Sequence, residues 1–364
     1  MPLPFLLWGA AAVVGAVGVG AGLSGKSDLE YAQSIAENIK TEYDELEADY
    51  KLKIDELNSV LEELGKVRLI ANEKIQKISA SMSKIGNVSK KEYNNFIQSI
   101  NYTKEEIEQM NLSSMKSSEI LQTGVKSLSS STLAGFGAMG LIGNLGFAST
   151  GAAISGLSGA AATNATLAWL GGGSLAAGGF GIAGGSVALG GIFLAPVALI
   201  GGFSLASKGK KAIIEAEKYE AKVKIAIEHL NSRIDFLKLA KKIANNYIEV
   251  ISVLDSKANL TYQELDKVID FYVDKNLQHL KNRPLWKKIF GLGKIDYLSP
   301  NNWEEEDLGI VLLGTTFAKH MNQLCNIQII DSEVVKEDSV KLLEHVSKDQ
   351  GINLQALAND SNFK

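Results

Sequence analysis

The sequence predicts an all-α fold in which long antiparallel coiled-coil arms flank a Gly/Ala-rich hydrophobic helical hairpin. Three observations support this fold class. The 364-residue chain has no charged residue and no histidine between Lys126 and Lys208, and 20 of its 35 glycines lie in that run of 81 residues. On both sides of the run, apolar residues recur at steps of three and four, as on one face of a helix. None of the five prolines lies between Pro4 and Pro196, which permits long uninterrupted helices.

Residues 1–25 are predicted to form an apolar N-terminal membrane segment. The stretch from Pro4 to Leu23 carries no charge and would span about 30 Å as a helix, the thickness of a bilayer core. No Lys or Arg precedes it, which argues against a cleaved signal peptide. We therefore expect the segment to be retained, either as a membrane helix or as a re-entrant anchor.

Residues 26–127 are predicted to form the first coiled-coil arm and a return helix. Ser27 and Glu30 have the spacing of a capping box, which would open the arm. The arm then carries one apolar stripe from Ile35 to Ile85, whose fourteen steps average about 3.57 residues, close to a coiled-coil repeat. A return helix is expected to begin near Thr103, with acidic residues in its first turn.

Residues 208–257 are predicted to form the second arm, with a stripe from Ala216 to Ile251. The two arms differ in charge. Residues 27–85 hold 8 basic and 13 acidic residues, whereas residues 208–257 hold 11 basic and 7 acidic residues. Opposite signs favour pairing of the arms with each other. Two solvated helix faces with unrelated partners are the alternative, because net charge specifies partners only loosely.

Residues 258–364 are predicted to form a C-terminal helical region with a polar tail. Thr261 and Glu264 have capping-box spacing and would open a helix that ends near Leu280. Apolar and basic residues then alternate over residues 283–294, as in segments that lie on a bilayer surface. A loop packed on the bundle fits the same pattern. The residues expected at a membrane surface are Trp286, Lys287, Lys288 and Phe290.

Residues 128–207 are predicted to form the hydrophobic hairpin, which would insert into a bilayer. Small residues at four-residue spacing let helices approach closely in lipid, where no hydrophobic force joins them. The predicted packing residues, with two from the N-terminal segment, are Gly18, Gly22, Gly151, Ser155, Gly159, Thr163, Gly181 and Gly185. Two alternatives remain: a hairpin sheltered by the arms and released later, and a Gly/Ala-rich core of a helical bundle.

The sequence contains one motif that resembles a nucleotide site. Gly20, Gly25, Lys26 and Ser27 match the P-loop pattern, which cradles phosphates when it joins a strand of a parallel sheet to a helix. No alternation of strands and helices accompanies it here, so the match is weak. The four histidines lack metal-ligand spacing, and Cys325 has no nucleophile motif around it. We expect no catalytic site, no cofactor and no metal, and the net charge of −4 argues against nucleic acid binding.

Residues 149–202, together with EAEKYEAKV at 215–223, resemble the glycine-rich segment and second helix of an uncharacterised bacterial family. Its members are glycine-zipper-like membrane proteins with flanking coiled-coil helices. The order of segments over residues 1–255 is also similar to that of the family. The architecture is similar to that of bacterial α-helical pore-forming toxins. The resemblance implies a bacterial origin and assigns no activity.

Together these patterns predict a non-enzymatic bacterial protein of the inner membrane. Its Gly-rich hairpin would insert in the lipid bilayer and oligomerise, permeabilising it, and its arms would join copies of the chain into a homo-oligomer. One alternative is a coiled-coil scaffold or sensor that is merely anchored in the membrane. The other is a membrane-remodelling protein driven by nucleotide binding at the P-loop-like residues.

Overall fold

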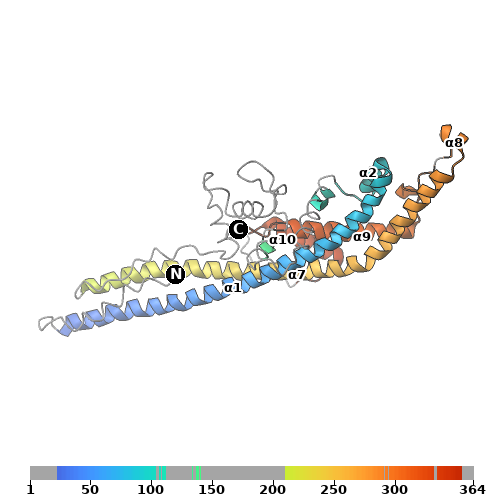
Figure 1. The fold of residues 1–364 in the computed structure, drawn as a ribbon. Helices are drawn as coiled ribbons and strands as arrows, with labels where there is room; N and C mark the ends of the chain where they lie inside the picture. The colour runs from blue at the N-terminus through green and yellow to red at the C-terminus, as the bar shows by residue number, and fades with distance from the viewer. Residues whose placement is uncertain are drawn as a thin grey trace, which may run out of the picture. The chain divides into compact units, whose positions relative to one another are not determined.

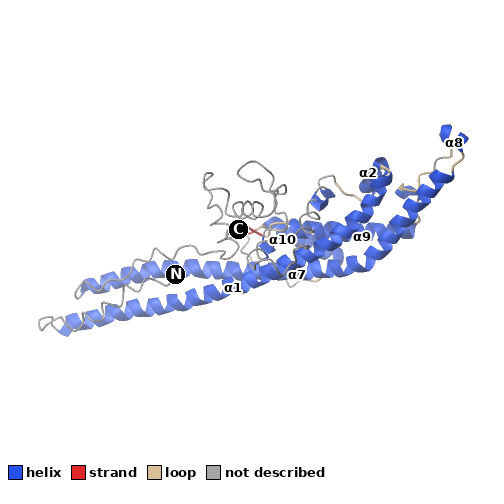
Figure 2. Cartoon of the chain, viewed as in Figure 1, coloured by secondary structure: helices blue, strands red, loops and turns tan. Residues whose placement is uncertain are grey.

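The computed structural model describes the chain in several stretches. These are residues 23–103, 106–107, 109–111, 133, 137–138, 140, 210–290, 292–293, 295–331 and 334–354. Within them the chain is predominantly helical, as predicted (Figure 2). The described strands are β1 (Ile330–Asp331) and β2 (Val334–Val335), which pair antiparallel with Ile330 opposite Val335.

Two helices are much longer than the rest. The first, α1, runs over Leu23–Val88 and has 66 residues, and α7 runs over Lys210–Asn282 and has 73. Both continue through positions where the sequence predicted a helix start. Ser27 lies inside α1, and Thr261 lies inside α7, where its hydroxyl donates to the Lys257 carbonyl 3.2 Å away. These two predicted helix starts are therefore wrong, because both residues lie inside continuous helices.

Shorter helices follow each of the long ones. A real cap separates α1 from α2 (Lys90–Ser99), where the amide of Glu92 donates to the hydroxyl of Ser89. After α7 come α8 (Leu285–Ile289), the 3-10 helix η6 (Pro300–Asn302), α9 (Glu305–Asn326) and α10 (Glu337–Gln350). The predicted helix start at Thr103 is confirmed. The Thr103 amide donates to Glu106 over 2.9 Å, and the Glu106 amide donates to the Thr103 hydroxyl over 3.1 Å.

The chain divides into two compact units, to which α1 and α7 both contribute. Unit 1 comprises Met1–Leu57 and Gly191–Leu239, and unit 2 comprises Asn58–Gly190 and Ala240–Lys364. In unit 1, Ala32 of α1 is fully buried with Ala212 and Ala216 of α7. Such small side chains let two helices pack closely along a shared stripe.

Unit 2 has the larger core. It contains α9, α10 and the C-terminal parts of α1 and α7 (Figure 1). The apolar stripe predicted for the first arm supplies one side of this core, and its members between 61 and 85 are at most 1% exposed apart from Val67. These residues are Leu61, Leu64, Ala71, Ile75, Ile78, Met82 and Ile85. The stripe was therefore predicted correctly over this stretch.

In unit 2, α1 and α7 run parallel, so the predicted antiparallel arrangement is wrong. The Lys74 ammonium donates to Asn259 over 2.7 Å, and the Lys84 ammonium contacts both Asp266 and Asp270 at 2.7 Å. Later residues of α1 thus meet later residues of α7. Apolar stripes and opposite charges stabilise a helix pair in either direction, so they could not decide it.

The start of the charge-free run is buried in unit 2. Leu133 and Gly137 lie against α1, because a Cβ on Gly137 would collide with the Leu61 carbonyl and one on Gly65 with the Leu133 carbonyl. The Ala138 carbonyl accepts from the Ile329 amide over 2.8 Å. Gly140 has a φ of +84° and leaves no room for a Cβ beside the backbone of Asn326. Protein surrounds this part of the predicted hairpin.

The membrane prediction needs correction. Among the helices in the described stretches, none is both long enough and apolar enough to cross a membrane. The two long helices carry charged side chains along their whole length, as the ion pair Lys40–Asp44 and the double contact of Lys84 illustrate. This finding overturns the prediction of a transmembrane, pore-forming protein located in a bacterial inner membrane.

Candidate functional site

The most distinctive surface feature of unit 2 is a tip, which we define as the described residues between Arg283 and Ile295. It follows the C-terminal end of α7 and includes α8 (Figure 1). Pro284 separates the two helices, because a proline has no amide hydrogen to continue the α7 ladder and fixes φ near −65°. Pro284 is the N-cap of α8, with a φ of −55° and an extended ψ of 145°.

The tip exposes large apolar side chains. Six of the sixteen exposed large hydrophobic residues in the described chain fall within positions 285–295. Leu285 is 78% exposed, Ile289 77% and Phe290 72%; the others are Trp286, Leu292 and Ile295. On α8 these form two pairs at i, i+4, Leu285 with Ile289 and Trp286 with Phe290, which share one side of the helix. Clustered exposed apolar side chains of this kind are typical of interaction surfaces.

The same segment is strongly basic. Residues 283–295 contain four Lys or Arg residues and no Asp or Glu, in a chain whose net charge is −4. The Lys287 ammonium lies 5.3 Å from the centroid of the Trp286 ring, and the Lys288 ammonium donates to the Lys281 carbonyl over 3.3 Å. The Arg283 guanidinium donates to the Lys287 carbonyl over 2.9 Å. Cationic groups therefore border the apolar side chains.

Polar contacts fix the base of the tip to α7. The Nε2 atom of His279 lies 3.1 Å from the Gly293 carbonyl, and the Ile295 amide donates to the same atom over 3.4 Å. Two residues after Ile295, the Tyr297 amide donates to the side-chain oxygen of Asn276 over 3.3 Å. Gly293 has a φ of +67°, which the turn requires and which other residues rarely adopt. The exposed side chains thus project from a constrained turn.

The structure places all four predicted surface residues in this tip. Trp286 and Phe290 are exposed, Lys288 is exposed, and Lys287 is half-buried. The alternative of a loop packed on the bundle does not apply to α8, which has no buried residue.

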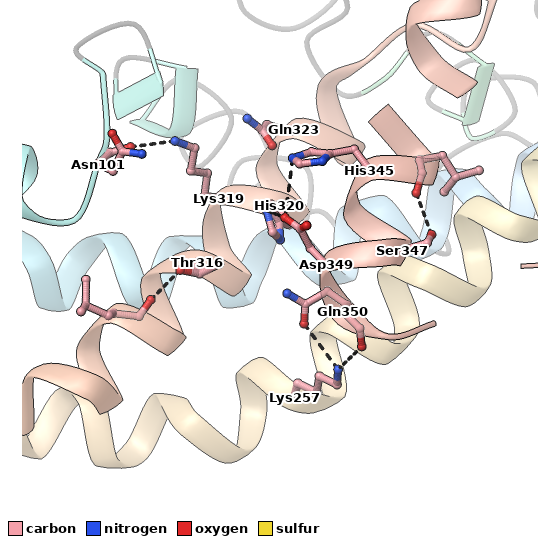
Figure 3. Close-up of polar contacts among 12 residues, drawn as sticks. Asn101, Lys257, Thr316, Lys319, His320, Gln323, His345, Ser347, Asp349 and Gln350 are labelled. Carbon is pink, nitrogen blue, oxygen red and sulfur yellow. Dashed lines mark hydrogen bonds and ion pairs between the residues drawn. The ribbon is translucent and has the colours of Figure 1, made fainter. Parts of the chain in front are cut away.

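A second polar cluster joins α9 to α10 and to the segment after α2 (Figure 3). The Lys319 ammonium donates to the Asn101 carbonyl over 2.7 Å and pairs with Glu106 at 3.1 Å. His320 and His345 approach the carboxylate of Asp349 from two sides, with Nε2–Oδ2 distances of 3.9 and 3.6 Å. The cluster holds three helical segments together.

His320 and the thiol of Cys325 in this region are buried. Burial lowers the pKa of His320, and the nearby Asp349 acts in the opposite direction. Burial raises the pKa of Cys325 to about 12, so its thiol stays protonated at neutral pH and is a poor nucleophile. In the part of the chain that the structure describes, no group of three His, Cys, Asp or Glu residues could hold a metal ion.

A buried arginine was missed by sequence reasoning. Arg68 of α1 is fully buried and donates to the carbonyl of Ile327, the C-cap of α9, over 3.1 Å. Its guanidinium carbon lies 5.6 Å from the centroid of the Tyr247 ring. A cation at a helix C-terminus is favourable because the helix dipole is negative there. Burial lowers the pKa of Arg68 to about 10, which still leaves it charged at neutral pH.

The remaining predicted site residues are not brought together by the described structure. Of the P-loop-like match, Gly25, Lys26 and Ser27 lie in the first turns of α1, and Gly20 lies outside the described residues. The only ladder within the described stretches is the two-residue antiparallel pair, whereas a P-loop needs a parallel sheet. All eight predicted helix-packing residues lie outside the described chain, namely Gly18, Gly22, Gly151, Ser155, Gly159, Thr163, Gly181 and Gly185.

No protein-family model, curated protein or solved structure matches the chain. The resemblance to a glycine-rich bacterial family therefore stays a prediction.

Proposed function

We propose that this chain is a non-enzymatic helical scaffold that attaches to an anionic bilayer surface through its tip. The observation that carries the proposal is the combination of exposed Leu285, Ile289 and Phe290 with a tip sequence, residues 283–295, that has four basic and no acidic residues. The proposal concerns attachment to a surface. No segment of the chain is proposed to cross it.

A bilayer surface suits the tip better than a protein partner for two reasons. First, the apolar groups belong to a five-residue helix and the turn after it, and a lipid interface accommodates such a short projecting element without a matching groove. Second, each Lys or Arg near an anionic lipid surface contributes about 1 kcal/mol of binding free energy. Trp286 adds an aromatic ring of the kind that is favoured at the level of lipid headgroups.

Co-sedimentation with vesicles tests the proposal. The full chain is expected to bind vesicles that contain phosphatidylglycerol, and to bind pure phosphatidylcholine vesicles much more weakly. Replacing Lys287 and Lys288 by Gln should weaken binding about 30-fold, because two charges at about 1 kcal/mol each are lost. Raising the salt concentration from 0.1 to 1 M should have a similar effect, because the ions screen the lysines.

The apolar contribution needs its own variant and a matched control. Ile289→Ser with Phe290→Ser should abolish measurable binding to phosphatidylglycerol vesicles. Leu260→Ser is the control, because Leu260 is 78% exposed on α7, as Leu285 is on α8. Exposed substitutions of this kind change folding stability by less than about 0.5 kcal/mol, so the helical content should stay the same. Equal binding of the tip variant and the Leu260 control would refute the proposal.

A further inference from the structure

Below the tip, the ammonium of Lys275 is surrounded by aromatic rings. Its Nζ atom lies 5.1 Å from the ring centroid of Phe271, 5.6 Å from that of Tyr272 and 5.0 Å from that of Tyr297. A cation within about 6 Å of a ring centroid is attracted by the negative face of the ring. Among the described residues, no hydrogen bond or ion pair involves Lys275. The three rings are therefore the groups of the described chain that the ammonium contacts, and Lys275 is otherwise exposed to solvent.

The walls of this cage are held in place by other parts of the structure. Phe271 and Tyr272 meet edge to face at an angle of 83°, with centroids 5.1 Å apart. Tyr272 is stacked on Trp303 at 4.7 Å and 8°, and its hydroxyl donates to Asp307 over 2.9 Å. The Tyr297 carbonyl accepts a hydrogen bond of 2.9 Å from the indole of Trp303. Tyr272 and Tyr297 are therefore held by contacts that do not involve the lysine.

The cage is partly exposed to solvent. Phe271 is 54% exposed and Lys275 is exposed, whereas Tyr272 is buried. A flexible lysine can therefore leave without any change in the backbone, and a solute can reach the same place. Rings arranged in this way recognise quaternary ammonium groups, which have a diffuse charge and are only weakly hydrated. A primary ammonium is strongly hydrated, so it has more to lose when it enters the cage.

We propose that Phe271, Tyr272 and Tyr297 form a binding site for a quaternary ammonium group, occupied in this structure by the Lys275 side chain of the same chain. The lysine acts as a tethered competitor that keeps the site filled until a better cation arrives. The site is independent of the attachment proposed for the tip, since none of its three rings belongs to the tip.

Titration with tetramethylammonium chloride, followed by the fluorescence of Trp303 and the aromatic NMR signals, tests the site in the full chain. Ionic strength is held constant with sodium chloride. Lys275→Ala removes the competitor and should tighten tetramethylammonium binding by about tenfold or more, as expected for a desolvated cation on aromatic faces. The double variant Lys275→Ala with Phe271→Ala should bind tetramethylammonium no more tightly than the wild type does. Lys267→Ala is the matched control on α7, because Lys267 pairs only with nearby Glu264 at 3.1 Å, and it should bind as the wild type does.

Two further arms complete the experiment. Free choline and choline presented as the headgroup of phosphatidylcholine vesicles are compared on Lys275→Ala, and the form that binds more tightly identifies the source of the ammonium group. Circular dichroism on each variant shows that the helices are retained. If Lys275→Ala binds tetramethylammonium no more tightly than the wild type or the Lys267 control, the proposal is overturned. A result with soluble tetramethylammonium does not depend on the tip, so failure of the tip proposal remains distinguishable.

Discussion

At the scale of single residues, the chain buries polar groups where sequence patterns indicate an apolar stripe. Val67 continues the predicted stripe of α1, yet it is only half-buried, and its neighbour Arg68 is fully buried. A polar residue beside a stripe position is ordinarily read as solvated, so no local signal could reveal that Arg68 meets the end of α9. The contact joins residues 259 positions apart and exists only after the chain has folded.

His320 predicts a dependence of stability on pH. Because burial lowers its pKa in the folded chain, the unfolded chain takes up the proton first as the pH falls. The contribution of neutral His320 to the free energy of unfolding is therefore fully present above pH 6.5, the ordinary pKa of histidine. It decreases as the pH falls below that value. The midpoint of thermal unfolding, measured from pH 7.5 to pH 5, should decrease, and His320→Asn should reduce that decrease.

The partner of His320 supplies a variant with the opposite effect. Asp349 is the charge that opposes the lowering of the pKa of His320. Asp349→Asn should lower this pKa further, so acidification should cost more stability than in the wild type. If His320→Asn and Asp349→Asn gave the same pH profile as the wild type, His320 would not be the group responsible.

At the scale of elements, the sequence predicted the long helices and their buried stripes, because a periodicity of three and four residues is a local property. The predicted antiparallel direction of the pair was wrong, because the helices run parallel. The sequence also did not predict that α7 continues past Thr261, since capping-box spacing also occurs inside helices whose burial elsewhere keeps them continuous. The aromatic cage around Lys275 was equally hidden, because Tyr297 lies 22 positions away and is brought back only by the turn at the tip.

The close contact between α1 and the start of the charge-free run predicts how a substitution at Gly137 changes folding stability. Gly137→Ala should destabilise the chain by about 1–3 kcal/mol, because the added methyl collides with the Leu61 carbonyl and overpacking has a cost of this size. Gly309→Ala is the control. A Cβ on Gly309 in α9 meets nothing within 4 Å, so helix propensity alone should stabilise the chain by up to about 1 kcal/mol.

Urea denaturation of both variants checks this prediction. Both substitutions add a methyl group to a helical glycine. If Gly137→Ala lowers the free energy of unfolding and Gly309→Ala raises it, the loss comes from the collision with the Leu61 carbonyl. Stabilisation by Gly137→Ala would mean that residues 133–140 do not pack on α1.

At the scale of the whole molecule, the two units differ in how completely α1 is buried. In unit 1 the buried apolar side chains of α1 range from 0% exposure at Ala32 to 9% at Ile54, whereas its core side chains from Leu61 to Ile85 in unit 2 are at most 1% exposed. Local opening is easier where fewer apolar contacts must be broken. Amide hydrogen exchange should therefore be faster for residues 30–55 than for residues 60–85.

Hydrogen exchange followed by mass spectrometry of peptides resolves the two parts of α1. Equal protection over the whole helix would contradict the difference and would indicate that α1 opens as a single cooperative element. Homo-oligomerisation through the arms stays a prediction, and the same samples can be compared at several concentrations to test it.

The parallel pairing of α1 and α7 also has a consequence during synthesis. Their contacts join residues 182–186 positions apart, so α1 leaves the ribosome long before its partner exists. At about 5–20 residues per second, the delay is roughly 10–40 s. During that time the apolar stripe of the newborn α1 is uncovered and can bind a chaperone or another nascent chain. More than half of the 364-residue chain must therefore be made before α1 acquires its neighbour α7, which begins at Lys210.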